Sequence, residues 1–192
     1  MPQAQAGEQA VATFAGGCFW CVEHDFDAVE GVISTTSGYI GGHVQTPSYR
    51  QVSYGGTGHT EAVRIVYDPS QVSYAQLLKR FWIGIDPTTA NAQFCDHGDQ
   101  YRPEIFTHTS AQKKAALHSL ENLKQSKPFK QPVVVAITDA ETFFPAETYH
   151  QDYHHKNPVR YKYYRFRCGR DQRLEELWQG YDAEQLIKGL AS

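Results

Sequence analysis

A short apolar segment that ends in two glycines is the feature that most limits how this chain can fold. Residues 11–15 read Val-Ala-Thr-Phe-Ala, which predicts a short buried strand, and Gly16-Gly17 follows directly. The segment 18–26 then carries apolar residues at helical spacings of three and four: Phe19, Val22 and Phe26. The pattern predicts a strand, a glycine turn and a helix in close succession, with Cys18 at the helix N-terminus.

Three further segments have the periodicity of regular secondary structure. Alternation over 61–67 predicts a strand whose more apolar face begins at Glu61. Ser73 and Gln76 form a capping box ahead of an apolar stretch, which predicts a helix that ends before Asp86. A second helix is expected over about 110–124, with three leucines on its buried side: Leu117, Leu120 and Leu123.

The remaining segments are less regular. The region 31–58 contains seven glycines and is expected to be loop-rich. Residues 132–137 predict a buried strand. The aromatic and basic stretch 161–167 is interpreted as strand or coil that packs its aromatic rings on the body, and short helices are expected around 174–178 and 182–190.

Few strands mixed with helices predict an α+β fold. A length of 192 residues fits one domain over 1–192, with a flexible N-terminus at 1–10 and a C-terminal tail at 158–192.

Composition excludes several classes of protein. Hydrophobic residues make up 41% and charged residues 20%, as in folded globular proteins. A net charge of −3 gives no general attraction to nucleic acid or to an anionic membrane. The longest uncharged apolar stretch, 11–22, is shorter than the roughly 18 residues that span a bilayer. We therefore expect a cytoplasmic protein with neither membrane nor nucleic acid as a partner.

Cys18 is a candidate nucleophile. A thiol at a helix N-terminus meets the positive end of the helix dipole, which favours the thiolate. The alternative is a small buried residue that follows a tight turn. Cys18 and Cys21 also have the spacing of a thioredoxin-like redox pair or half of a zinc site. A zinc site could recruit three further residues: Cys95, His97 and His59.

Glu61 is the second candidate, because a carboxyl group on an apolar strand face loses hydration and its pKa rises toward neutral pH. A solvated strand end is the alternative. Tyr49 and Tyr101 follow loop segments and could aim phenol donors into a pocket, although most of the 12 tyrosines must be structural. Three histidines are interpreted as a polar helix or loop face: His150, His154 and His155.

Five ordered motifs together resemble the peptide methionine sulfoxide reductase A family. They are Gly16-Gly17-Cys18-Phe19-Trp20, Gly38-Tyr39-Ile40-Gly41-Gly42, Pro47-Ser48-Tyr49-Arg50, Gly58-His59-Thr60-Glu61-Ala62-Val63 and Asp96-His97-Gly98-Asp99-Gln100-Tyr101-Arg102. The resemblance covers about residues 14–157. It implies a two-layer α+β sandwich with a ferredoxin-like mixed sheet and an extended C-terminal tail. It also implies an enzyme that reduces the S epimer of methionine sulfoxide, free or within proteins.

The resemblance assigns a role to each candidate. Cys18 is the nucleophile and Glu61 the acid, Tyr49 and Tyr101 are hydrogen-bonding phenols, and no metal or organic cofactor is required. The substrate is expected to meet three further residues: Phe19, Trp20 and Asp96.

The resemblance further implies that a second thiol closes a disulfide on the Cys18 sulfenic acid, which thioredoxin then reduces in a monomeric enzyme. Cys168 in the tail is the first choice for that thiol, and Cys21 and Cys95 are the alternatives. Two other functions stay open. One is a thiol–disulfide oxidoreductase or redox-sensing module that uses Cys18 and Cys21 without Glu61, and the other is a zinc-binding module.

Overall fold

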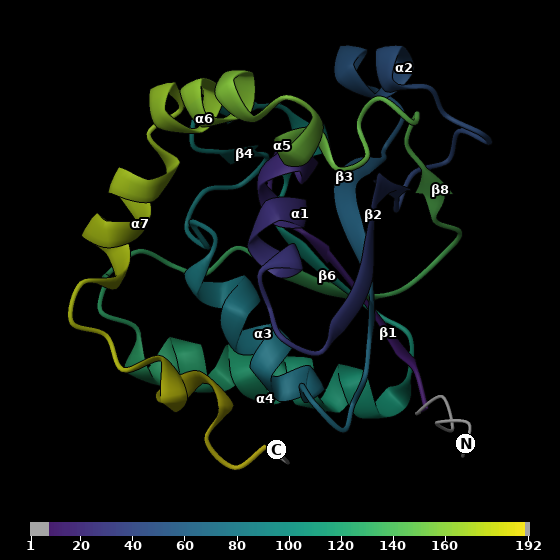
Figure 1. The fold of residues 1–192 in the computed structure, drawn as a ribbon. Helices are drawn as coiled ribbons and strands as arrows, with labels where there is room; N and C mark the ends of the chain where they lie inside the picture. Colours follow the sequence, from purple (N-terminus) through teal and green to yellow (C-terminus); the bar gives the residue numbers. More distant parts are fainter. Residues whose placement is uncertain (1–7, 191–192) are drawn as a thin grey trace, which may run out of the picture.

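A computed structural model describes residues 8–190, and its centre is a mixed sheet of six strands (Figure 1). The strands lie in the order β7-β6-β1-β3-β2-β8, and every neighbouring pair is antiparallel except β6 and β7. Their bounds are β1 Ala10–Ala15, β2 Val32–Ile40, β3 Thr60–Tyr67, β6 Glu104–Thr107, β7 Ala136–Asp139 and β8 Phe144–Pro145. A separate small hairpin pairs β4 Ala92–Gln93 with β5 Asp96–His97.

Seven α-helices and two short 3-10 helices complete residues 8–190. The α-helices are α1 Phe19–Asp27, α2 Tyr49–Tyr54, α3 Tyr74–Ile83, α4 Ser110–Ser126, α5 Tyr153–Lys156, α6 Pro158–Arg167 and α7 Arg170–Trp178. The 3-10 helices are η1 Asp99–Tyr101 and η2 Ala183–Ile187. Figure 1 shows α1 lying across the strands, with α6 and α7 passing around one side of the molecule.

The main core lies between one face of the sheet and the helices. Phe14 of β1 is fully buried, and its ring stacks on Phe26 of α1 at 5.3 Å and on Phe81 of α3 at 5.0 Å between centroids. The opposite face carries a smaller cluster: Ala15, Ile40, Ala62 and Phe106. Burial of large apolar side chains is the main stabilising contribution, at roughly 2 kcal/mol for each.

Pairing of β1 with β3 brings two distant motifs together. Phe14 lies opposite Val63 and the strands run antiparallel, so the chain leaves β1 after Ala15 at the end of β3 that carries Glu61. The glycine turn that leads to Cys18 therefore begins next to Glu61 at one end of the sheet.

The most periodic segments fold as predicted. The apolar segment forms β1, the helix after the glycine turn is α1, and the alternating segment is β3. Ser73 caps α3, since its hydroxyl oxygen accepts from the Gln76 backbone N–H while the Gln76 side chain bonds back to Ser73 N.

Several weaker expectations are wrong. The region 31–58 is not mainly loop, because it contains β2 and α2. Leu117 of α4 is 49% exposed rather than buried, whereas Leu123 is fully buried. The strand expected over 132–137 is β7, which starts four residues later and lies at the exposed edge of the sheet, where a continuous apolar run is not required.

The tail also differs from its prediction. Residues 158–167 form helix α6 rather than strand or coil, because Pro158 begins the helix and the buried Tyr161 and the partly buried Tyr164 and Arg165 share one helical face. The expected flexible segment 1–10 lies largely outside the described residues, and Ala10 already belongs to β1. Across residues 8–190, no helix combines the length and apolarity needed to cross a membrane.

Candidate active site

The turn before Cys18 requires glycine. Gly17 has a φ of +83°, and a Cβ at this position would lie 2.5 Å from the Gln93 Cβ. The carbonyl of Cys18 accepts the first hydrogen bonds of α1 from the backbone N–H groups of Cys21 and Val22. Cys18 is therefore the N-cap residue of α1, as the sequence predicted.

Burial has the opposite effect on Cys18 from the one that the helix dipole alone predicted. The residue is 7% exposed, and burial raises the pKa of its thiol, as do the Cys21 thiol beside it and the charges of Glu61 and Asp96. Cys18 is thus a protonated thiol near neutral pH. Cys18 and Cys21 are both free thiols.

Glu61 is a buried carboxyl group aimed at the start of α1. It is 2% exposed, and its Oε2 accepts a hydrogen bond of 3.0 Å from the backbone N–H of Phe19. Burial raises its pKa to about 8, in the direction that its place on the strand predicted, although the hydrogen bond from Phe19 acts against this. Near neutral pH Glu61 is therefore mostly protonated and can donate a proton next to Cys18.

Tyr49 and Tyr101 come to this site from different elements. Tyr49 is the first residue of α2, and its backbone N–H donates to Glu147 Oε1 at 2.7 Å. Burial raises the pKa of Tyr49 to about 12, and the charges of Glu61 and Cys18 add to the effect. The pKa of Tyr101, the last residue of η1, is raised by burial and then by Glu61. Both phenols therefore keep their protons and can act as donors.

Aromatic side chains form an apolar wall beside Cys18. Phe19 is 1% exposed, and Trp20 is half-buried with its ring stacked on Tyr153 at 3.7 Å between centroids. The indole N–H of Trp20 donates to His150 Nδ1 at 3.1 Å. These contacts hold the indole in place, two residues after Cys18 in the sequence.

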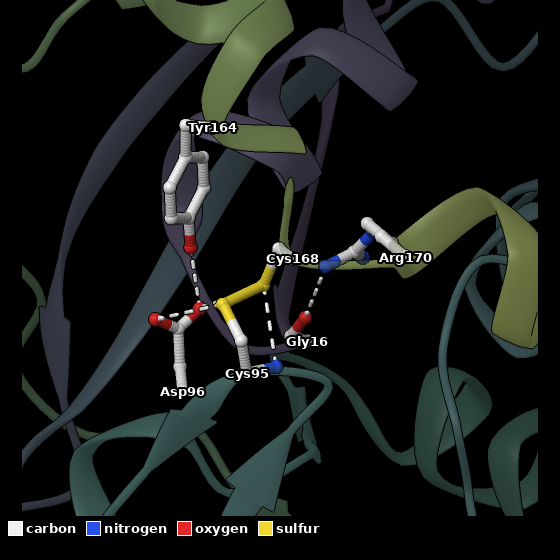
Figure 2. Close-up of a disulfide and its surroundings, with 6 residues drawn as sticks. All are labelled: Gly16, Cys95, Asp96, Tyr164, Cys168 and Arg170. Atoms are coloured by element: carbon white, nitrogen blue, oxygen red, sulfur yellow. Dashed lines mark hydrogen bonds between the residues drawn. A yellow bond between two sulfur atoms is a disulfide. The ribbon is translucent and has the colours of Figure 1, made fainter. Parts of the chain in front are cut away.

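A disulfide joins Cys95 to Cys168, with 4.9 Å between their Cα atoms (Figure 2). Asp96 lies against both sulfurs, its Oδ1 at 3.9 Å from Cys95 Sγ and its Oδ2 at 4.0 Å from Cys168 Sγ. The Tyr164 hydroxyl donates to the same carboxylate. The charge of Asp96 also contributes to the raised pKa of Cys18, so the same carboxylate acts on the disulfide region and on the candidate nucleophile.

The disulfide pairing differs from the one expected from the sequence. The resemblance made Cys168 the first choice for the partner of Cys18, with Cys21 and Cys95 as alternatives. The structure joins Cys168 to Cys95 and leaves Cys18 free. Cys95 reaches Cys168 because the small hairpin that carries Cys95 meets the end of α6. The two cysteines are 73 residues apart, and their spacing in the sequence does not reveal this contact.

The structure does not assemble the predicted zinc ligands. Cys95 is held in the disulfide, and both ring nitrogens of His59 already bond to the backbone at Gly42 N and Val44 O. Within residues 8–190, two other groups bring potential ligand atoms within 4.8 Å of one another, and neither contains Cys18: Asp27, His154 and His155, and Cys95, Asp96 and Cys168.

Four residues near the site were missed by sequence reasoning. His150, taken for part of a polar face, is 1% exposed, and Glu147 bonds both Tyr39 and Tyr49. Tyr164 and Arg170 come from the tail. Local sequence patterns do not define the path that the tail takes over the rest of the protein. The only sequence feature that pointed to a functional tail was the aromatic and basic stretch that precedes Cys168.

Comparisons with known proteins place this chain among named relatives. A family model described as "Peptide methionine sulfoxide reductase" matches residues 10–182. The chain is similar to peptide methionine sulfoxide reductase MsrA of Bacillus licheniformis, with 46% identity over 94% of this chain and 99% of that protein. It is 50% identical to MsrA of Ligilactobacillus salivarius over 87% of this chain and 96% of that protein. It also matches a longer protein named MsrA/MsrB in Vibrio cholerae at 47% identity, of which it spans 44%.

Solved structures share the fold of this chain. The fold matches Mxr1 from Saccharomyces cerevisiae in its reduced form with a TM-score of 0.73 and 30% identity, over 81% of this chain and 90% of that one. It matches methionine sulfoxide reductase A of Corynebacterium diphtheriae with a TM-score of 0.71 and 32% identity, over 81% and 78% of the two chains. Mxr1 in complex with Trx2 shares 19% identity and a TM-score of 0.53 over 79% and 89%, which shows a common fold alone.

Proposed function

The chain belongs to the peptide methionine sulfoxide reductase family, and we propose that Cys18 is the thiol that takes the oxygen from the sulfoxide. The activity that the resemblance implied is confirmed: the protein is an oxidoreductase that reduces methionine sulfoxide, and we propose that it acts on the S epimer. The observation that carries our proposal is the placement of Glu61, a buried and mostly protonated acid, directly beside the start of α1 and its N-cap Cys18.

In the first step, the Cys18 sulfur attacks the sulfoxide while Glu61 donates a proton to the sulfoxide oxygen. A sulfoxide is a poor electrophile until its oxygen is neutralised, so the acid is needed during the attack. The proton lost by the Cys18 thiol balances the one that Glu61 delivers. Methionine leaves as the thioether, and Cys18 holds the oxygen as a sulfenic acid.

Neighbouring side chains orient the substrate in this proposal. The phenols of Tyr49 and Tyr101 donate hydrogen bonds to the sulfoxide oxygen, since both keep their protons. The apolar surface formed by Phe19 and Trp20 receives the methyl group. Asp96 carries a partly buried carboxylate at the edge of the site, where it can hold a polar group of the substrate.

The Cys95–Cys168 bond supports a relay of the oxidation through two more thiols. Cys168 condenses with the Cys18 sulfenic acid, which releases water and forms a Cys18–Cys168 disulfide. Cys95 then attacks the Cys168 sulfur, which frees the Cys18 thiol and leaves Cys95 bonded to Cys168. The pairing of the cysteines in the structure matches the end point of this relay: Cys18 is a free thiol, and Cys95 is bonded to Cys168.

We further propose that thioredoxin reduces the Cys95–Cys168 bond by thiol–disulfide exchange. The position of Cys95 supports this, because its residue is exposed whereas Cys18 is buried. A complex of yeast Mxr1 with Trx2 is consistent with such a partner. The wider description remains part of the proposal: a cytoplasmic monomer, one domain over 1–192, a ferredoxin-like core within the sheet, and no cofactor, membrane or nucleic acid.

Turnover on separate epimers tests the function. We expect the protein with dithiothreitol to release methionine from the S epimer of methionine sulfoxide and essentially none from the R epimer, measured by chromatography of the free amino acid. Reduction of both epimers at similar rates, or of neither, would contradict the proposal. Oxidation and reduction of the four thiols without methionine release would favour a thiol–disulfide oxidoreductase instead.

Removing one thiol at a time tests the relay. After one equivalent of sulfoxide, Cys95→Ser is expected to stop with a Cys18–Cys168 disulfide, because the thiol that frees Cys18 is missing. Cys168→Ser is expected to release about one methionine per chain and then retain the sulfenic acid. Peptide mapping by mass spectrometry identifies both states, and Cys21→Ser serves as the control that still forms Cys95–Cys168. If Cys95→Ser recycles with thioredoxin as fast as the parent, Cys95 is not in the relay.

A further inference from the structure

We infer that Arg170 is a positioning residue for the relay, because it holds the three thiol-bearing segments together. This inference rests on the proposed function, and it concerns the transfer of oxidation from Cys18 to Cys168 rather than the reduction of the sulfoxide. Arg170 is the first residue of α7, two positions after Cys168, and is only 2% exposed.

The guanidinium group of Arg170 contacts the segment of each thiol. Its Nη1 donates to the carbonyl of Gly16 at 3.2 Å, two residues before Cys18 (Figure 2). Its Cζ lies 4.6 Å from the centroid of the Phe94 ring, directly before Cys95. Cys168 is tied to these contacts by the short, left-handed turn at Gly169 that precedes α7.

Two further contacts orient the side chain. Nη2 donates to the carbonyl of Gly84 at 2.8 Å, and Nε lies 3.9 Å from Asp25 Oδ2. Asp25 has two other cationic partners, Arg80 and Arg165, so it does not depend on Arg170 for a counter-charge. A buried arginine that donates to two backbone carbonyls and also stacks on an aromatic ring uses the planar, forked shape of the group, which lysine lacks.

This geometry has a kinetic consequence. Condensation of Cys168 with the Cys18 sulfenic acid, and the attack of Cys95 on Cys168, are both reactions between groups on different segments. Their rates depend on effective concentration, which falls when the segments are free to separate. Because Arg170 bonds near Cys18 but not to Glu61 or the tyrosines, its loss should slow the relay and spare the first step.

The test compares two reductants in Arg170→Gln and Arg170→Lys. Dithiothreitol can reduce the Cys18 sulfenic acid directly, so turnover with it bypasses the relay. We expect Arg170→Gln to turn over within about twofold of the parent with dithiothreitol but at least about tenfold more slowly with thioredoxin, thioredoxin reductase and NADPH. Arg170→Lys, which keeps the charge, should recover part of the loss.

Trapping the intermediate separates positioning from a general loss of structure. In a single turnover with dimedone present, Arg170→Gln should release methionine at the parent's rate and accumulate dimedone-labelled Cys18. Arg80→Gln is the matched control, since it also removes a cation from Asp25 but does not contact Gly16 or Phe94. It should show neither effect.

Two results would overturn the inference. One is that both Arg170 variants recycle with thioredoxin as fast as the parent and give no extra dimedone adduct. The other is that methionine release and thioredoxin-driven turnover fall equally, with a matching loss of thermal stability, which would make Arg170 a purely structural residue. If Arg170→Gln does not fold, the same comparison on Arg170→Lys decides. A failure of sulfoxide reduction in the parent protein would instead count against the proposed function.

Discussion

Cys18→Ser abolishes methionine release from the S sulfoxide, with a fall of at least about a thousandfold in the rate of the first step. Serine keeps nearly the same size, so the buried N-cap position of α1 should still fold. Its hydroxyl is a far weaker nucleophile toward sulfur than a thiol. Single-turnover methionine release, followed by rapid quenching and chromatography, measures the effect.

Cys21→Ser is the matched control, because it also removes a buried thiol of α1 from the neighbourhood of Cys18. It should still release about one methionine per chain. Methionine release by Cys18→Ser at a rate near the parent's would remove Cys18 from the mechanism, and loss of release in Cys21→Ser alone would transfer the role to Cys21.

Glu61→Gln slows the first step by roughly a hundredfold to ten-thousandfold at neutral pH, which is the usual contribution of a general acid. Glutamine retains the shape of the side chain and an oxygen that can accept from the Phe19 backbone N–H. It cannot donate an acidic proton to the sulfoxide oxygen, so the loss is chemical rather than structural.

The acid role of Glu61 predicts how the rate of the first step changes with pH. The acid form of Glu61 is the active one and its pKa is about 8, so the rate of the first step in the parent should fall as pH rises through about 8. In Glu61→Gln this dependence should disappear, and the deficit should shrink at acidic pH where solvent can supply the proton. A variant as fast as the parent at neutral pH would exclude Glu61 as the acid.

The parts of the fold predicted from sequence are those with strong local signals. The strand, glycine turn and helix that place Cys18 follow from periodicity and from the two glycines, and α3 follows from its capping box. The alternation of apolar residues identified the strand that carries Glu61. The family resemblance carried by the five motifs pointed to the residues expected near it: Cys18, Tyr49 and Tyr101. The direction of the Glu61 pKa shift was predictable, because its place on the more apolar strand face indicated a loss of hydration.

Features that depend on contacts between distant segments were not predictable in the same way. The pKa of Cys18 was expected to be low from the helix dipole, but burial and the thiol of Cys21 raise it, and burial is a property of the whole fold. The Cys95–Cys168 pair and the anchoring of Arg170 require the path of the tail over the body. No local pattern in α6 or α7 encodes that path.

In the proposed reaction sequence, Cys18 takes the oxygen and passes the oxidation on to Cys95 and Cys168. Its most direct test starts from the fully reduced protein, which is mixed with one equivalent of the S sulfoxide, quenched by alkylation and mapped by mass spectrometry. We expect one methionine per chain, a Cys95–Cys168 disulfide, and alkylated Cys18 and Cys21. A final state in which Cys18 remains in a disulfide, or in which Cys95 and Cys168 are still reduced after methionine release, would exclude this relay.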